Sequence, residues 1–504
     1  MARKNNNHPR ADVHQVEKAA HADRGHGVQL EGPGWQRRLL EWGVEARGIH
    51  PVAPEERTDP QFSKMFFVLF TSSVNLLPFS AGSLGPIAYG LSLRDSSLII
   101  LFFNLLCCIP PGYLSTWGPK MGLRQMVQAR YSFGYYGDIV PVLLNLIGMT
   151  GICILDCILG GQTLAAAADG NLSWSVGIVI IAVVSLLVSF CGWKILHWYE
   201  RIAWIPVTII FLIAVGLGGK NFHHIPPTEP STVQTILSYA AVIAGFNLTW
   251  SPLSSDFSCY MRPGAPSKRI FWYAYLGLLL PTVALQCFGA LIGACLANVP
   301  AWEAGYESGN VGGILNAMLS PAKGFGKFLT VLLALSVMGN VAATFYSVSL
   351  NMQVLMPILV LVPRYVFSIL VTCIVIPLSI VGAHSFYSTL SNFLGLIGYW
   401  ASAFIAIVLE EHFIIRKGNA TLYDLADWNT PSRLPSGVAA IFAMLCGIGI
   451  AIPSMAQVWY TGPIAATTGD IGFELAFVVT MVIYPPLRLL EIRLRGILFV
   501  EKDL

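Results

Sequence analysis

The stretch AVIAGFNLTWSPLSSDFSCY, from Ala241 to Tyr260, decides the fold of this chain. It begins like a membrane-spanning helix and is then interrupted by polar or helix-breaking residues at Asn247, Thr249, Ser251 and Pro252. In hydrocarbon every backbone N–H and C=O needs a partner, so irregular backbone survives there only where it is buried in protein or lines a cavity. Trp250 stands in the break, where its ring could stack on a flat molecule. A ligand site and a simple proline kink both fit this stretch taken alone.

The composition places the chain in a membrane. Of its 504 residues, 55% are hydrophobic and only 11% are charged, against about 25% charged in soluble domains. The net charge of +3 is too small to indicate nucleic-acid binding. The cysteines lack the spacing of disulfides or of a zinc site, so no metal and no cofactor are expected. Nucleophile elbows and paired-carboxylate clusters are missing from the sequence, so an enzyme is not expected.

Apolar runs long enough to cross the lipid bilayer, which takes about 20 residues of helix, occur twelve times. The expected spans are 66–92, 96–116, 138–167, 174–191, 202–219, 236–258, 270–297, 326–354, 363–382, 389–409, 436–457 and 471–489. The predicted fold class is therefore an all-α polytopic membrane protein with about 12 transmembrane helices. The N-terminal region lacks the apolar core of a signal peptide, so the first span must act as the insertion signal.

The basic residues of the loops predict the orientation. Loops on the side of the N-terminus hold twelve of them: Lys120, Arg124, Arg130, Lys194, Arg201, Arg262, Lys268, Arg269, Arg364, Arg416, Lys417 and Arg433. The opposite loops hold four: Arg94, Lys220, Lys323 and Lys327. Under the positive-inside rule, both termini are expected in the cytosol and the protein in the cell membrane.

A second broken helix lies in the first span, SSVNLLPFSAGSLGPIAYG, from Ser72 to Gly90. Residues that disfavour a regular helix crowd its centre: Asn75, Pro78, Ser80, Gly82, Ser83, Gly85 and Pro86. Interrupted first and sixth spans indicate two inverted five-helix repeats with a site near the bilayer midplane. The expected parts are a cytosolic tail with a short amphipathic segment (1–65), the first repeat (66–219), the second repeat (220–409), a cytosolic loop (410–435), two last spans (436–489) and a cytosolic tail (490–504).

An acid lies near the centre of the third span, in MTGICILDCILGGQ from Met149 to Gln162. A charge at that depth costs a few kcal/mol, so Asp156 is expected to face a cavity, a partner or an ion path. It could carry a proton or hold a donor-rich or cationic ligand. A permanently protonated Asp156 in an interhelical hydrogen bond is the alternative.

Polar residues share one face of the eighth span, LSVMGNVAATFYSVSLN, from Leu335 to Asn351. They recur at three- and four-residue spacing: Ser336, Asn340, Thr344 and Ser347. Small residues beside them would equally allow close helix packing. The tenth span holds residues that fit either a moving gate or a tight helix crossing: Asn392, Gly395, Gly398 and Tyr399.

The loop between the second and third spans, STWGPKMGLRQMVQARYSFGYYG (Ser115 to Gly137), is basic and rich in glycine and aromatic residues. We expect it to fold onto the core as a helix and hinge. Together with VEARGIHPVAPEERTDPQF (Val44 to Phe62) and SSLIILFFNLLCCIPPGYLSTWGPK (Ser96 to Lys120), it resembles the purine-cytosine permease family of fungi and bacteria, within the nucleobase:cation symport group. The likeness runs from about Leu39 to the last span.

The resemblance implies two inverted five-helix repeats plus two C-terminal helices, which transport a substrate with an ion by alternating access. It implies a substrate site between the first, third, sixth, eighth and tenth helices. Trp250 matches the family's stacking tryptophan of the sixth helix, and Asp256 with Tyr260 matches the acidic-aromatic pattern after it. We expect Asp256 to act as a gate or capping residue. The gate or structural residues expected in all are Asp256, Tyr260, Pro78, Gly82, Pro252 and Tyr399.

The chain departs from the family in the third and eighth helices. A second stacking tryptophan and an amide of the family's third helix are Ile152 and Asp156 here. In the eighth helix, paired asparagines and Pro-Asn of the family correspond to Asn340, Val341, Ala343 and Thr344. Losing one stacking face, worth about 1–3 kcal/mol, should weaken ordinary nucleobase binding. The expected substrate contacts are Trp250, Asp156, Thr344, Asn340, Ser83, Ile152 and Thr249.

The same eighth helix bears on the coupling ion. Sodium-driven relatives carry hydroxyls where this chain has Met338 and Gly339, and a hard cation needs oxygen ligands. Proton coupling through Asp156 is therefore expected. The predicted function is secondary active, proton-coupled uptake of a nucleobase or related flat nitrogen heterocycle. A transporter of a cationic vitamin-like or secondary-metabolite heterocycle is one alternative, and a non-transporting nutrient sensor is the other. The sequence leaves the oligomeric state open.

Overall fold

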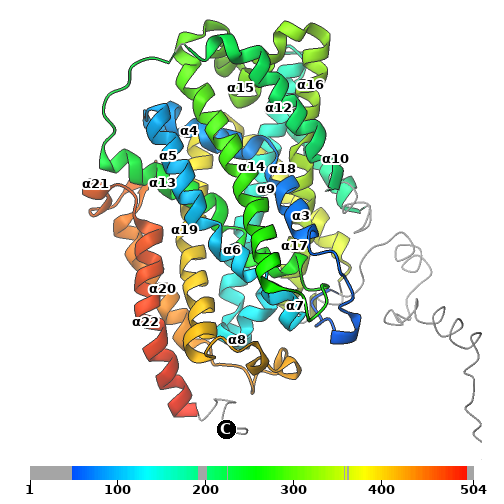
Figure 1. The fold of residues 1–504 in the computed structure, drawn as a ribbon, viewed down its shortest axis with the longest axis vertical. Coiled ribbons are helices and arrows are strands. Elements are labelled where there is room, and N and C mark those ends of the chain that lie inside the picture. Colours follow the sequence, from blue (N-terminus) through cyan, green and yellow to red (C-terminus); the bar gives the residue numbers. More distant parts are fainter. Residues whose placement is uncertain (1–47, 191–200, 224, 357, 360–361, 496–504) are drawn as a thin grey trace, which may run out of the picture.

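The computed structural model describes residues 48–190, 201–223, 225–356, 358–359 and 362–495. These residues form an elongated bundle of helices (Figure 1). One short antiparallel hairpin, β1 (Ala456–Gln457) and β2 (Tyr460–Thr461), is the only sheet in this part of the chain. The predicted all-α class is confirmed. The expected N-terminal tail and its amphipathic segment lie mostly outside the described residues.

The helices follow the apolar runs of the sequence. Those up to the fifth predicted span are α3 (Lys64–Ser73), α4 (Leu76–Tyr89), α5 (Leu93–Cys107), α6 (Ile109–Leu114), α7 (Trp117–Met121), α8 (Gln125–Gly137), α9 (Ile139–Ala167), α10 (Trp174–Phe190) and α12 (Trp204–Gly218). Those that follow are α13 (Val233–Leu248), α14 (Ser267–Cys295), α15 (Pro300–Leu319), α16 (Lys323–Leu335), α17 (Val337–Leu355), α18 (Arg364–Gly382), α19 (Phe386–Glu410), α20 (Val438–Ser454), α21 (Ala465–Thr468) and α22 (Gly472–Arg495).

The number of membrane spans agrees with the sequence once the breaks are considered. By length and composition, eight described helices can cross a membrane, or nine when α3 and α4 count as one bent span. The continuous stretch Tyr365–Ile415 joins two predicted spans, and α10 and α20 are shorter apolar helices. These three features account for the difference from the twelve predicted spans.

The first span is broken between α3 and α4, whose axes differ in direction by 53°. The Asn75 side chain accepts a hydrogen bond from the backbone N of Leu77 at 2.7 Å and donates to the carbonyl of Ser72 at 2.6 Å. One amide therefore satisfies backbone groups of both half-helices. Pro78 lies in the first turn of α4, where backbone N–H groups have no partner within the helix, so a proline there costs α4 no hydrogen bond. In a continuous helix Pro78 would clash with the carbonyl of Val74 and could not donate to it, so Pro78 stops α3 from continuing and Asn75 satisfies the backbone groups at the break.

The sixth span is broken after Leu248, where α13 gives way to the 3-10 helix η3 (Ser251–Phe257). The Ser254 hydroxyl donates to the carbonyl of Trp250 at 2.8 Å, and the Ser255 hydroxyl donates to the carbonyl of Leu114 at 2.9 Å. The Ser254 hydroxyl therefore satisfies a backbone carbonyl at the break, and the Ser255 hydroxyl ties the break to α6. The break predicted in this stretch is confirmed.

Some elements are absent from the sequence prediction, among them α15, the β1–β2 hairpin and the short α21. Helix α15 occupies the connection between α14 and α16, and it bends at Gly309 and Asn310, where Asn310 has a φ of 49°. Its polar residues, which include Glu303 and Glu307, hid it from a search for apolar runs. The β1–β2 hairpin pairs two residues with two, which is too short for an alternating strand pattern to show in the sequence.

The end of the bundle that carries α7, α8 and the loop after α19 is here called the basic end (Figure 1). As predicted, α8 folds onto the core with a hinge, at Gly134, whose φ is 72°. The Tyr131 hydroxyl donates to the carbonyl of Asp424 at 2.6 Å, and Arg130 Nη2 donates to the carbonyl of Val354 at 3.1 Å. These bonds fix α8 to α17 and to the loop after α19.

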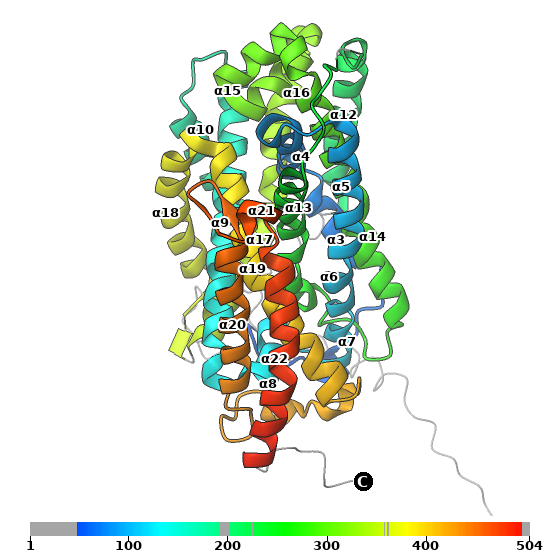
Figure 2. The ribbon, with the colours of Figure 1, turned by 90° about the vertical axis from the view of Figure 1, so that its left-hand side faces the viewer.

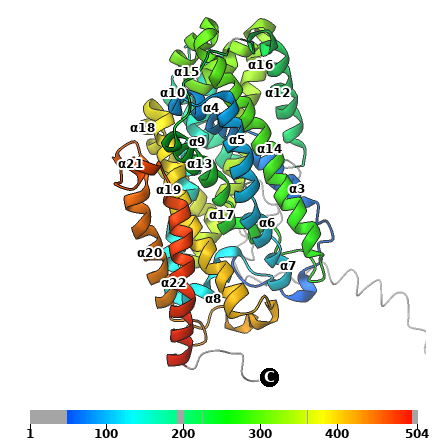
Figure 3. The same ribbon diagram turned by 60° about the vertical axis from the view of Figure 1, so that its left-hand side comes forward.

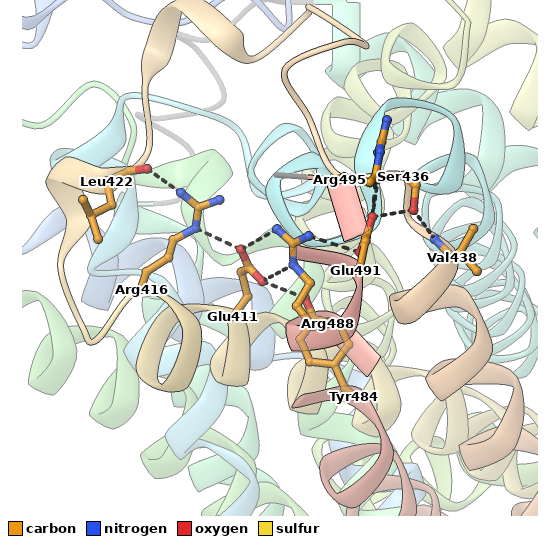
Figure 4. A network of polar contacts seen from close by, with 9 residues as sticks. All are labelled: Glu411, Arg416, Leu422, Ser436, Val438, Tyr484, Arg488, Glu491 and Arg495. Atoms are coloured by element: carbon orange, nitrogen blue, oxygen red, sulfur yellow. Dashed lines mark hydrogen bonds and ion pairs between the residues drawn. The ribbon is translucent and has the colours of Figure 1, made fainter. Parts of the chain in front are cut away.

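The two long C-terminal helices, α20 and α22, lie side by side against α19 (Figures 2 and 3). A buried polar network joins α22 to the basic end of α19 (Figure 4). The Glu411 carboxylate accepts hydrogen bonds from Arg488 Nε at 3.1 Å, from the Tyr484 hydroxyl at 2.8 Å and from Arg416 Nε at 3.0 Å. Arg488 also bonds Glu491 at 3.1 Å. Because two arginines share the buried Glu411 carboxylate, its charge is compensated.

Candidate functional site

A cavity lies where the two broken spans meet α9, α17 and α19. Fifteen residues line it: Ser72, Ser73, Leu77, Asn145, Gly148, Met149, Ile152, Phe246, Thr249, Trp250, Leu253, Asn340, Thr344, Ile397 and Trp400. Its volume of about 40 Å³ is room for about three water molecules. A heterocycle can therefore enter only when the helices around the cavity move apart.

Aromatic side chains form part of the cavity wall. Trp250 stands in the break of the sixth span and is 9% exposed, and Trp400 of α19 is 6% exposed. Phe246 lies one turn before Trp250. The Trp400 ring lies close to Gly148 of α9, since a Cβ at this glycine would be in van der Waals contact with Cζ2 of the indole, at 3.7 Å. The cavity thus offers two indoles, from the sixth and tenth predicted spans, to a flat ring.

Asp156 lies behind the cavity wall. Its side chain is fully buried, and its Oδ2 accepts a hydrogen bond from Nδ2 of Asn340 at 2.8 Å. Its Oδ1 has no hydrogen-bond partner among the described residues. Asn340 itself lines the cavity. The amide of Asn340 therefore connects the buried carboxyl group with the space that a ligand would occupy.

Five of the seven expected substrate contacts line the cavity: Trp250, Thr249, Ile152, Asn340 and Thr344. Asp156 is one layer behind them, and Ser83 lies elsewhere. The Ser83 hydroxyl donates to the carbonyl of Ser80 at 2.9 Å and lies 3.1 Å from the hydroxyl of Tyr387. Ser83 therefore joins α4 to α19 and does not line the cavity.

Three polar residues of the cavity wall were missed by the sequence prediction. Ser72 and Ser73 end α3, and Asn145 lies two turns before Ile152 on the same face of α9. Each is 2% exposed, and the two hydroxyls and the Asn145 Nδ2 have no hydrogen-bond partner in the described chain. An unpaired buried polar group costs about 1–3 kcal/mol, so these atoms are available to a ligand. The seven-residue spacing from Ile152 was a usable signal for Asn145.

Tyr399 points away from the cavity, whereas the next residue, Trp400, lines it. The Tyr399 hydroxyl donates to Asp470 and accepts a hydrogen bond from Nε2 of Gln457 at 2.5 Å. Successive residues of a helix are turned by about 100°, so only one of the two can face the ligand. Gly398 lies where α19 crosses α13, because a Cβ there would be 3.4 Å from the Cα of Gly245. A closer approach of α13 and α19 is at Gly245, where a Cβ would clash with the carbonyl oxygen of Leu394, and this packing favours the tight-crossing alternative.

Asp256 and Tyr260 meet Arg124 at the basic end. Arg124 donates to the carbonyl of Asp256 at 2.6 Å and to the Tyr260 hydroxyl at 3.1 Å. The Asp256 carboxylate accepts a hydrogen bond from the backbone N of Gln125 at 2.9 Å, the first residue of α8. These contacts attach the end of the broken sixth span to α8. The geometry of Asp256 is that of a helix cap.

Gly82 and Pro252 serve packing and local backbone structure. A side chain at Gly82 would clash with the carbonyl of Gln286, because α4 and α14 cross in close contact there. Pro252 occupies the second position of η3, where its missing N–H removes no helical hydrogen bond.

Residues 51–476 match the family described as permeases for cytosine/purines, uracil, thiamine and allantoin. The chain belongs to this permease family. Purine-cytosine permease fcyB of Emericella nidulans is 34% identical to this permease over 467 residues, which cover 92% of this chain and 91% of fcyB. Purine-cytosine permease FCY2 of Saccharomyces cerevisiae is 32% identical over 467 residues, 90% of this chain and 87% of FCY2. The vitamin B6 transporter TPN1 of the same yeast is 29% identical over 518 residues, 91% of this chain and 90% of TPN1.

Solved transporters share the fold of the permease. Mhp1, a nucleobase-cation-symport-1 family transporter in a closed conformation with bromovinylhydantoin bound, has a TM-score of 0.68 and 15% identity, covering 90% of this chain and 96% of Mhp1. A Na⁺-coupled sialic acid symporter has a TM-score of 0.57 and 12% identity, covering 91% of this chain and 96% of that chain. At these identities the likeness concerns the fold alone. The permease is a multi-pass membrane transport protein, and the relatives named here are transporters, not enzymes.

Proposed function

We propose that the permease takes up a purine or pyrimidine base, or a related flat nitrogen heterocycle, together with protons by alternating access. The cavity at the two helix breaks carries this proposal. It presents the indoles of Trp250 and Trp400 beside the amide of Asn340, which is bonded to Asp156. Indoles bind the flat faces of a ring, while an amide can both donate to and accept from its polar edge.

We also propose that the basic end faces the cytosol and that both termini lie there, in a protein of the cell membrane. The orientation is supported by the sequence, which predicts twelve Lys or Arg residues in the loops on the side of the N-terminus and four in the opposite loops. The proposed division of the chain is two inverted repeats, 66–219 and 220–409, followed by the last two spans, 436–489. The broken first and sixth spans in corresponding positions support it.

The contact between Asp156 and Asn340 suggests how a proton is coupled to the substrate. When Asp156 is a carboxylate, Asn340 donates its NH₂ group to it and leaves its carbonyl oxygen for the cavity. When Asp156 is protonated, its O–H donates to the Asn340 carbonyl, and the amide turns its NH₂ group toward the cavity. The proton on Asp156 therefore decides whether Asn340 presents an acceptor or a donor to the substrate. An acceptor favours a substrate that donates a hydrogen bond there, and a donor favours one that accepts it.

The helix that carries Asn340 lacks the side chains expected of a sodium site. Met338 and Gly339 stand where sodium-driven relatives carry hydroxyls, and neither offers an oxygen ligand. This supports the proton as the coupling ion.

A cationic or vitamin-like heterocycle is the second candidate substrate. An acid at Asp156 in place of the family's amide supports it, because a carboxylate near the cavity favours a protonated ring nitrogen. The similarity to a protein named as a vitamin B6 transporter also supports it. The unpaired polar atoms of Ser72, Ser73 and Asn145 would suit the hydroxyl groups of such a ring.

The proposal is tested by uptake into a yeast strain that lacks its own permeases. Labelled cytosine, adenine and pyridoxine are offered, each with the others as competitors. A protonophore should abolish accumulation, and replacing sodium should leave it unchanged. Asp156→Asn should lose accumulation while substrate still binds. Uptake that continues with the protonophore but stops without sodium would show that sodium, and not the proton, is the coupling ion.

The same experiment decides between transport and sensing. A transporter accumulates label above the medium concentration, whereas a nutrient sensor of the same fold shows saturable binding without accumulation. If cytosine and adenine compete at micromolar concentrations and Asp156→Asn transports normally, then having Asp156 in place of the family's amide does not change which substrate is transported.

A further inference from the structure

The loop between α20 and α22 is fastened to the outer half of α19, where outer means away from the basic end. Nε2 of Gln457 donates to the hydroxyl of Tyr399 at 2.5 Å, and the backbone N of Val458 donates to Oδ1 of Asn392 at 2.8 Å. Gln457 also packs on Gly395, since a Cβ at this glycine would lie 2.5 Å from Nε2 of Gln457. The outer half of α19 cannot move alone without breaking these contacts.

Asp470 is the centre of this attachment. Its Oδ2 accepts hydrogen bonds from the Tyr399 hydroxyl, from the backbone N of Ala456 at 3.0 Å and from Nε2 of Gln457 at 3.2 Å. Its Oδ1 accepts from the backbone N of Gly472 at 3.0 Å. The carboxyl group is 2% exposed. One acid therefore holds the hairpin, the start of α22 and α19 together.

The surroundings of Asp470 allow it to bind a proton from outside. An outer cavity of about 330 Å³, lined by Gln457 and Ser238 among others, adjoins it, and a cavity of this size holds many water molecules. The nearby titratable groups are Tyr399 of α19, Tyr89 of α4 and Glu474 of α22. No described lysine or arginine forms an ion pair with Asp470. Burial raises the pKa of Asp470, whereas the four groups bonded to its carboxylate are all donors and lower the pKa. Losing the Tyr399 donor while the carboxyl group stays buried raises the pKa further, so proton binding favours the released state.

We propose that Asp470 is a second proton-binding site of the permease and that its protonation releases the outer half of α19. The inference rests on the proposed transport cycle, and it concerns a residue far from Asp156 in sequence. Hydrogen bonds to a charged acceptor are roughly twice as strong as those to a neutral one. Protonation therefore weakens the bonds that Asp470 accepts from Tyr399, Ala456 and Gln457 together.

The release would open the outer side of the permease. Two hydrogen bonds between uncharged hydroxyls then remain between α4 and α19, Tyr89 to Ser391 at 2.7 Å and Ser83 to Tyr387 at 3.1 Å. Such bonds contribute only about 0.5–1.5 kcal/mol each. Because Tyr399 directly precedes Trp400 in α19, the same movement displaces an indole of the central cavity. A proton taken from outside would thus favour the state that admits substrate.

The test measures opening of the outer side without substrate or a proton gradient. Ile397 lines the central cavity on α19, so the thiol of Ile397→Cys is reached from outside by an impermeant reagent only when the outer side opens. The labelling is read on the peptide that contains residue 397, because native cysteines such as the exposed Cys373 can also react. The labelling rate is divided by that of Thr228→Cys, an exposed position, to correct for thiol ionisation. With native Asp470, this ratio should rise as the pH falls from about 7.5 to about 5.5, by up to about tenfold for each unit by which the pKa of Asp470 is higher in the open state than in the closed state.

Two variants separate the proton site from a merely structural role. Asp470→Asn should make the ratio independent of pH, and Tyr399→Phe, which keeps the acid but removes its bond to α19, should do the same. Asp95→Asn, at an outer acid bonded to Ser231, should keep the full pH response. A response that persists in both Asp470→Asn and Tyr399→Phe, or a ratio that does not change with pH in the parent, overturns the proposal. Asp156→Asn should keep the labelling response, so a failure of proton-coupled uptake is distinguished from a failure of this inference.

Discussion

Replacing Trp400 by alanine should weaken substrate binding as much as replacing Trp250. Each indole lines the cavity and is nearly buried, and a stacked aromatic face is worth about 1–3 kcal/mol. This range corresponds to an increase of about 5- to 150-fold in the Kd. The KM should change more than the maximal uptake rate, because the indole contributes to substrate binding more than to the movement of the helices. Trp400→Phe keeps an aromatic face and should lose less.

Binding is measured on purified protein by competition with a labelled heterocycle, and folding is checked by size-exclusion chromatography. Trp459 provides a matched control, because its indole is 62% exposed in the outer hairpin, and Trp459→Ala should bind normally. If Trp400→Ala binds within twofold of the parent protein while Trp250→Ala loses binding, then Trp400 is a packing residue and the substrate has one stacking partner.

Two further predictions concern stability. Arg488→Met leaves the buried Glu411 carboxylate with fewer partners, and breaking a buried ion pair costs about 3–5 kcal/mol. A clear fall in the thermal stability of the purified protein is expected, and an unchanged melting temperature would contradict it. Gly245→Val places a side chain against the carbonyl of Leu394, where α13 meets α19. It should leave little monodisperse protein, whereas Gly216→Val, with open space around its Cβ, should express normally.

The spans and their breaks were predictable because the bilayer imposes them. Apolar length and backbone satisfaction are local properties, so the interruption of the sixth span near Trp250 could be located from the sequence alone. The cause of the first break was less visible. Seven helix-disfavouring residues crowd that span, and the structure shows that Asn75 supplies the bonds that allow the break. Pro78, the more obvious breaker, lies within the first turn of α4.

The cavity wall was predictable only in part, because it depends on how helices turn toward one another. Five expected contacts line the cavity, and all of them lie on spans that the family resemblance marks as the site. Trp400 was missed because its neighbour Tyr399 carries a polar group and so drew the prediction. The partner of Tyr399, Asp470, is 71 residues away in the chain. A local sequence pattern cannot predict a contact between residues so far apart in the chain.

The position of Trp400 explains why the site can lack an indole at residue 152. The third-helix indole that the family resemblance leads one to expect is absent, and the Trp400 ring lies over Gly148, one turn from Ile152 on α9. Helix α9 packs against α10, α15, α16, α17 and α18. An indole at residue 152 would therefore lie on a helix that is held in place by its neighbours. An indole on α19 belongs instead to the helix that Asp470 fastens. In the proposed cycle, the movement that opens the outer side would therefore also withdraw one stacking face from the substrate. Substrate affinity and outer opening would then be linked through a single helix.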